Sequence, residues 1–221
     1  LRESDLLKRQ AGFDRQKWLS RFGINANAGQ LVSLFCYEPD ALPALLVRLR
    51  EGAMPTQLLV THGRATVAVR RWMGGIEPGH SPGAHVDIGN LTLIFLPALS
   101  QLDFDHLLWS CDLNFVRGED SVARAIWADR PFVWQIYPQG DGAHHAKLDA
   151  VLQAMATPAS WRSFHAAWNG VSATLPEWDL PAWRRAASGA RAALLAQSDL
   201  ATRLLEFAEA PQTSRSVPEN R

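Results

Sequence analysis

The chain has few of the features that mark secreted or membrane-spanning proteins. Only two of its 221 residues are cysteine, Cys36 and Cys111, and both lie within short apolar runs. That placement is typical of reduced thiols buried in a core, and the two residues lack the spacing of a zinc site. No apolar run approaches the roughly 18 residues of a membrane-spanning helix, so we expect no membrane span.

An excess of charge of either sign is also absent. Lys and Arg together number 22 and so do Asp and Glu, which gives a formal net charge of zero. The sequence therefore offers no general attraction for nucleic acid or an anionic membrane, and we expect neither as a partner. The chain begins with Leu1 and shows no signal-peptide pattern, so we expect a cytoplasmic protein and a piece of a longer one.

Several well-known site motifs are missing as well. There is no G-x-G-x-x-G and no G-x-x-x-x-G-K-[ST], which argues against a dinucleotide oxidoreductase and a P-loop NTPase. There is no H-E-x-x-H or G-x-S-x-G either. His144 and His145 are adjacent at an expected helix start, where neighbours do not share a face, so we predict no metal site.

What the sequence does contain is a repeated alternation of short apolar runs with helical patterns. The runs expected to form buried strands are 31–37, 56–62, 91–97, 111–117 and 132–137. The expected helices are 5–22, 40–51, 64–73, 101–110, 118–127, 143–156, 158–169 and 180–209, the last of them long or broken. This order is typical of βαβ units and predicts an α/β fold, a Rossmann-like parallel sheet with helices on both faces.

We divide the chain into four parts on this pattern. Residues 1–22 form an N-terminal or interdomain helix, 23–175 the Rossmann-like domain, 176–210 a helical segment and 211–221 a disordered polar tail. A loop rich in glycine and proline is expected between 74 and 83.

In open α/β sheets, ligands bind beyond the carboxyl ends of the strands. The loop after the fourth run is the most informative, because Gly118 permits a tight turn and Glu119, Asp120 and Ser121 follow in the first turn of a helix. Free backbone N–H groups there form a potential phosphate site, to which Arg117 adds charge. Ordinary helix capping would account for the same residues more simply.

Other candidates carry weaker signals. Tyr37 and Phe104 have rings that suit stacking on a nucleotide base, but packing accounts for them equally well. We interpret His62, Gly63 and Arg64 as a plain turn after the second strand, and Lys147 as a solvated side chain.

Three segments resemble the protein-arginine rhamnosyltransferase family. The first is Cys111-Asp112-Leu113-Asn114-Phe115-Val116-Arg117-Gly118-Glu119-Asp120-Ser121, and the second is Pro131-Phe132-Val133-Trp134-Gln135-Ile136-Tyr137-Pro138-Gln139, with Asp141, His144 and Lys147-Leu148 after it. The third is Ser33-Leu34-Phe35-Cys36-Tyr37-Glu38. The resemblance extends in order and spacing from about residue 1 to residue 170.

This resemblance implies the C-terminal, nucleotide-sugar-binding half of a two-domain glycosyltransferase of the B type. It implies transfer of L-rhamnose from dTDP-β-L-rhamnose to an arginine of translation elongation factor P, with inversion and with no metal or other cofactor. Carried over by position, Glu119 is the acidic residue on which activity depends. The other positions contact the donor: Arg117, Gly118, Asp120 and Ser121 surround the diphosphate, and Tyr37, Gln101, Phe104 and Tyr137 line the nucleotide.

Two departures from the family pattern matter. Ala98 stands where family members tend to carry phenylalanine, which removes one aromatic wall of the base pocket. The family's catalytic base, an aspartate, belongs to an N-terminal half that this sequence lacks. We therefore expect the chain alone to bind donor weakly and to transfer no rhamnose. The alternatives left open are a nucleotide-binding module without catalysis and another α/β enzyme of sugar nucleotides, such as a dehydrogenase or epimerase.

Overall fold

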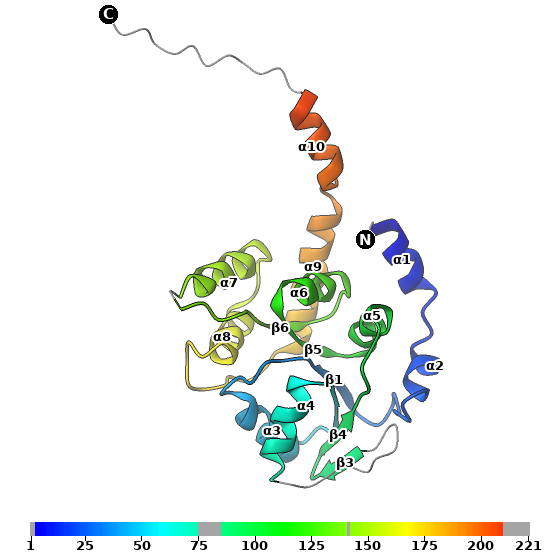
Figure 1. Cartoon of the computed structure of the whole chain (residues 1–221), viewed down its shortest axis with the longest axis vertical. Helices are drawn as coiled ribbons and strands as arrows, with labels where there is room; N and C mark the ends of the chain where they lie inside the picture. Colours follow the sequence, from blue (N-terminus) through cyan, green and yellow to red (C-terminus); the bar gives the residue numbers. More distant parts are fainter. Residues whose placement is uncertain (1–2, 75–84, 141, 210–221) are drawn as a thin grey trace, which may run out of the picture.

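A six-stranded sheet in the order β3-β4-β2-β1-β5-β6 forms the centre of the molecule (Figure 1). The structure, a computed structural model, describes residues 3–74, 85–140 and 142–209. The strands are β1 (Gln30–Leu34), β2 (Thr56–Val60), β3 (His85–Ile88), β4 (Leu91–Phe95), β5 (Leu113–Arg117) and β6 (Phe132–Gln135). All neighbours pair in parallel except β3, which runs antiparallel to β4.

Helices connect the strands and extend both ends of the fold. They are α1 (Glu3–Ala11), α2 (Arg15–Ser20), α3 (Leu42–Glu51), α4 (Arg64–Trp72), α5 (Gln101–Ser110), α6 (Gly118–Trp127), α7 (Ala143–Ala154), α8 (Ala159–Trp168), α9 (Leu180–Leu195) and α10 (Leu200–Glu209). No helix in these described stretches is both long and apolar enough to cross a membrane.

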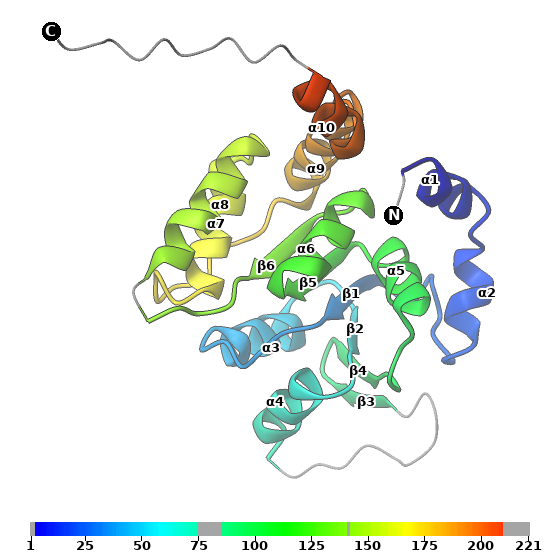
Figure 2. The same ribbon diagram turned by 45° about the horizontal axis from the view of Figure 1, so that its top comes forward.

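The sheet is covered on both faces, and β1 shows why its sequence is apolar throughout. Leu31 packs in a cluster with residues of α2 and α5, whereas Val32 packs in another with residues of α3 and α4. Figure 2 shows these two helix pairs on opposite sides of the central strands. Because alternate side chains of a strand point to opposite faces, a strand buried on both faces carries a continuous apolar run. The predicted fold class is confirmed.

The sheet differs from the prediction at its edge. The segment His85–Ile88, predicted as no element, forms the sixth strand and makes the sheet mixed rather than wholly parallel. Its residues alternate between exposed and half-buried, with only Val86 and Ile88 apolar. A four-residue edge strand that faces solvent gives too short a pattern to stand out from a loop.

The predicted helix 5–22 is wrong in its continuity, because the chain leaves helical geometry between α1 and α2. Asp14 caps α2 by accepting a hydrogen bond from the backbone N–H of Lys17 at 2.9 Å. Aspartate favours the N-cap position, and here it starts a second helix within a segment that the apolar spacing alone predicted as a single helix.

The predicted C-terminal helix 180–209 is divided into α9 and α10. Trp183 of α9 is fully buried and stacks on Trp161 of α8 with 5.7 Å between ring centres. By contrast, α10 has no buried residue and extends away from the rest of the chain in Figure 1. The expected tail 211–221 and most of the expected loop 74–83 lie outside the described residues, and the division into domains stays a prediction.

Candidate functional site

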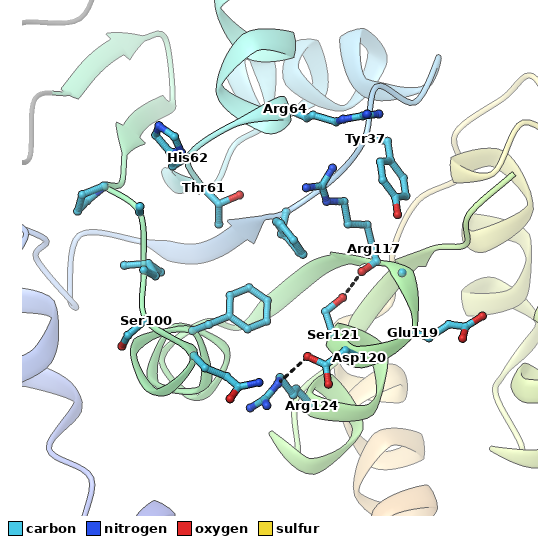
Figure 3. A pocket seen from close by; sticks show the side chains of 17 residues that line it. Tyr37, Thr61, His62, Arg64, Ser100, Arg117, Glu119, Asp120, Ser121 and Arg124 are labelled. Atoms are coloured by element: carbon cyan, nitrogen blue, oxygen red, sulfur yellow. Dashed lines mark hydrogen bonds and ion pairs between the residues drawn. The ribbon is translucent and has the colours of Figure 1, made fainter.

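A cavity of about 670 Å³ opens at the carboxyl edge of the sheet. Successive connections run from β1 to β2 and β4, then return past β1 to β5 and β6 on its other side. Such a change of direction separates the loops beyond the strand ends and leaves a crevice for a ligand. Figure 3 shows the lining side chains, which are Phe35, Tyr37, Thr61, His62, Arg64, Pro97, Ala98, Leu99, Ser100, Gln101, Phe104, Arg117, Gly118, Glu119, Asp120, Ser121 and Arg124.

One wall of the cavity is the start of α6. Gly118 has a φ of 69°, a backbone conformation that side-chain-bearing residues rarely adopt. The indole Nε1 of Trp134 donates to the carbonyl oxygen of Gly118 at 2.7 Å, and the backbone N–H of Trp134 donates to Nε2 of His165 at 2.9 Å. Both side chains are buried. This network fixes the turn at the start of α6, whose residues 118–121 line the cavity. The free N–H groups of a first helical turn favour an anion there.

The hydroxyl of Ser121 also supports this turn. Its Oγ donates back to the carbonyl oxygen of Arg117, one helical turn earlier, and the residue is 5% exposed. In the free protein the Ser121 hydroxyl therefore serves the backbone of the loop rather than pointing an unused donor at the cavity.

The two acidic side chains of the first turn are both paired with cations. Glu119 forms an ion pair with Lys147 of α7, and in Figure 3 its carboxylate points away from Arg117. Asp120 accepts from Nε of Arg124 at 3.1 Å, and Arg124 also pairs with the buried Asp105 at 2.8 Å. Lys147 therefore compensates Glu119, whereas Asp120 shares the single charge of Arg124 with Asp105.

Aromatic rings and an arginine form the floor. The guanidinium of Arg117 lies 4.5 Å from the ring centre of Phe35 and 4.6 Å from that of Tyr37. Phe35 meets Phe104 edge to face at 5.3 Å between ring centres. No carboxylate in the described part of the chain pairs with Arg117. An unpaired guanidinium beside flat apolar rings suits a ligand with an aromatic ring and an anionic tail.

The structure brings together all of the predicted site residues except Tyr137. Tyr137 lies outside the cavity lining, is 62% exposed, and meets Tyr37 edge to face at 5.8 Å between ring centres. The predicted roles of the site residues stay predictions, since their positions alone do not define what each one contacts. Lys147 was predicted to be solvated; it is half-exposed but paired with Glu119.

His62 and Gly63 form a turn and Arg64 starts a helix, as interpreted; in addition, Thr61, His62 and Arg64 line the cavity, which was not predicted. The guanidinium of Arg64 lies 5.6 Å from the ring centre of Tyr37. The sequence carried only the part of a signal for this placement that concerns the edge of the sheet, and not which loop lies beside which. The second apolar run was expected to be parallel to the first, and the ends of parallel strands share one edge of a sheet.

The cysteines have no role that the geometry supports. Both are free and fully buried. Burial raises the pKa of the Cys36 thiol to about 12 and also raises the pKa of Cys111, so neither is a thiolate nucleophile near neutral pH.

His144 Nδ1 accepts from the backbone N–H of Gln139 at 3.1 Å. Within the described ranges, no three His, Cys, Asp or Glu side chains are grouped as a metal site would require.

A mostly parallel sheet with a cavity at its switch point defines an open α/β protein with a ligand-binding crevice at the carboxyl edge of the sheet. The family model described as "Elongation-Factor P (EF-P) rhamnosyltransferase EarP" matches residues 1–209. The chain belongs to this family, as the resemblance of its three segments had indicated.

Individual relatives agree with this assignment. The chain is 39% identical to the protein-arginine rhamnosyltransferase of Pseudomonas aeruginosa and 39% identical to that of Pseudomonas putida. Each match covers 94% of this chain and 59% of the relative, so the chain spans about three-fifths of the length of these proteins. A solved structure described as "Structural basis for EarP-mediated arginine glycosylation of translation elongation factor EF-P" has a TM-score of 0.77 and 35% identity, over 94% of this chain and 71% of that one.

Proposed function

We propose that this chain is the donor-binding part of an inverting glycosyltransferase of the B type, which transfers L-rhamnose from dTDP-β-L-rhamnose to an arginine of translation elongation factor P in the cytoplasm. The observation that carries the proposal is the cavity at the switch point, where an unpaired Arg117 and the start of α6 adjoin aromatic rings. The names of the relatives supply the reaction class and the acceptor.

The donor would lie across the carboxyl edge from the start of α5 to the start of α6. The base would stack beside Phe104 and contact Gln101, while Arg117 and the N–H groups of α6 would hold the diphosphate. These groups compensate the phosphate charge, so the proposed reaction uses no metal. Ala98 lines the cavity together with Gln101, and its methyl group offers the base less contact area than an aromatic ring would.

The chain by itself is not expected to complete the transfer. The acceptor guanidinium has a pKa above about 12, so a carboxylate must orient it and take its proton as the new bond forms. In the cavity, the carboxylates of Glu119 and Asp120 are both engaged by cations. The base would come from the part of the longer relatives that this chain does not span.

The test is calorimetric titration of the chain with dTDP, with UDP as the matched ligand, repeated on Arg117→Gln. We expect saturable binding that prefers dTDP and falls by about tenfold or more in the variant, because a charged hydrogen bond to phosphate is lost. Equal affinity for the two nucleotides, or no binding to a chain with a cooperative melting transition, would contradict the assignment of the cavity.

Transfer is tested separately. The chain is incubated with dTDP-β-L-rhamnose and elongation factor P, and the mass of the acceptor is measured. We expect no change; a gain of one deoxyhexose would show that the chain carries its own base.

A further inference from the structure

Arg64 lies on the wall of the cavity opposite the start of α6. It is the first residue of α4, and Gly63 precedes it with a φ of 93°. The side chain is exposed and lines the cavity, with its guanidinium 5.6 Å from the ring centre of Tyr37. In Figure 3 Arg64 reaches over Tyr37 from the side of β2, whereas Arg117 reaches toward the same ring from the side of β5.

Arg64 and Arg117 differ from the other cations near the cavity in their ion pairs. Arg124 is paired with Asp105 and Asp120, and Lys147 is paired with Glu119. In the portion of the chain that the structure describes, neither Arg64 nor Arg117 has a carboxylate partner. The cavity therefore holds two uncompensated guanidinium groups against one ring.

The two guanidinium groups lie 5.6 and 4.6 Å from the centre of one ring, so they are at most about 10 Å apart. Like charges at such a separation repel each other most strongly when a ligand excludes water from between them. An anion that contacts both groups removes this cost and gains charge-assisted hydrogen bonds from each. A diphosphate fits this arrangement better than a single phosphate, because its two phosphoryl groups can each meet one guanidinium.

We propose that Arg64 is a ligand-binding residue of this cavity that contacts the diphosphate of the nucleotide on the side away from α6. Arg117 and Arg64 then both contact the diphosphate next to Tyr37, and Arg64 makes the site prefer a nucleoside diphosphate to a monophosphate. The identity of the nucleotide rests on the proposed function, whereas the need for a diphosphate rests on the two guanidinium groups.

The experiment compares the chain with Arg64→Gln and Arg64→Lys by calorimetric titration with dTDP, dTMP and inorganic pyrophosphate. Arg203→Gln in α10 is the matched control, since it removes an exposed arginine from a helix with no buried residue. We expect Arg64→Gln to weaken dTDP and pyrophosphate by about tenfold and dTMP by less than about twofold. Arg64→Lys should lie between, because it keeps the charge without the planar fork, and the control should match the parent chain. Melting curves establish that each variant is folded.

The outcomes separate this proposal from the function proposed for the cavity. Unchanged dTDP and pyrophosphate affinity in Arg64→Gln overturns the role of Arg64 and leaves a dTDP-preferring site intact. An equal loss for dTMP and dTDP overturns the diphosphate contact. Binding of pyrophosphate but not dTDP, lost in Arg64→Gln, supports Arg64 and contradicts the nucleotide assignment. No binding of either ligand to the parent chain overturns both.

Discussion

α4 and α6 both begin at the carboxyl edge of the sheet beside the same cavity, but the charged residues in their first turns differ in sign. Each follows a glycine with positive φ or starts on one, and in neither does a side chain cap the first turn. The first turn of α6 carries Glu119 and Asp120, whereas that of α4 carries no acidic residue and starts with Arg64, which pairs with no carboxylate among the described residues.

The hydrogen bonds and ion pairs that hold the first turns of α6 and α4 also differ. The start of α6 is held by the buried Trp134 and His165 and, one turn later, by the Arg124–Asp105 pair. At the start of α4, the hydroxyl of Thr66 donates a hydrogen bond to the carbonyl oxygen of Thr61 at 2.8 Å. The comparison indicates that the start of α6 is fixed before a ligand binds. The side chain of Arg64 is exposed, so it can change its conformation when a ligand binds.

The strongest test of this difference is to remove the buried partner of α6. Asp105→Ala leaves the Arg124 guanidinium, whose side chain is 12% exposed, without its buried carboxylate. Breaking such a pair from one side costs about 3 kcal/mol or more of the free energy of unfolding. Asp120→Ala removes the exposed partner of the same arginine and should cost less than about 1 kcal/mol. Urea denaturation measures both, and equal losses would show that α6 is not anchored through Asp105.

A second test is the pH dependence of the network behind α6. Burial lowers the pKa of His165 to about 4, although a hydrogen bond with the backbone of Trp161 opposes the shift. A histidine that must be neutral in the folded state contributes its full stability above an unfolded pKa of about 6.5, and this contribution is lost as the pH falls toward 4. We expect a loss of about 3 kcal/mol across that window.

The control for this test is removal of the imidazole itself. His165→Gln should flatten the dependence of unfolding free energy on pH between 6.5 and 4. If the variant keeps the slope of the parent chain, the titration belongs to another group.

The smallest expected difference concerns the two glycines. Gly63 has φ 93° and ψ −130°, a region that residues with a Cβ essentially avoid, so Gly63→Ala should cost about 2 kcal/mol. Gly118 has φ 69°, and an added Cβ would meet only the Tyr37 hydroxyl at 3.5 Å, so Gly118→Ala should cost about 1 kcal/mol. Thermal denaturation gives the ranking; a reversed order would mean that contacts, and not backbone strain, dominate at α6.

Most of the fold could be predicted because its strands are buried on both faces. β1, β2, β5 and β6 lie in short, mainly apolar runs, and a run of that length between turn residues is typical of a buried strand. The edge strand His85–Ile88 escaped prediction because only half of its surface is covered, and the break between α1 and α2 escaped because helical spacing continues across it.

The candidate site was predicted in part for a similar reason. Gly118 and its neighbours were found because a turn glycine followed by polar residues at a helix start is a local signal. Arg64 was not found, since nothing in the segment His62–Arg64 shows which loop lies beside which. Tyr137 was placed with the site by resemblance, yet it lies outside the cavity lining and meets Tyr37 edge to face.

The sequence by itself determined the α/β class, the positions of the buried strands and the turn that starts α6, since each of these depends on neighbours within a few residues. The tertiary structure alone decided the order of the strands, which places the end of β2 next to that of β1 and brings both Arg64 and Arg117 to the ring of Tyr37. Strand order depends on packing between segments far apart in the chain, and no local pattern of residues encodes it.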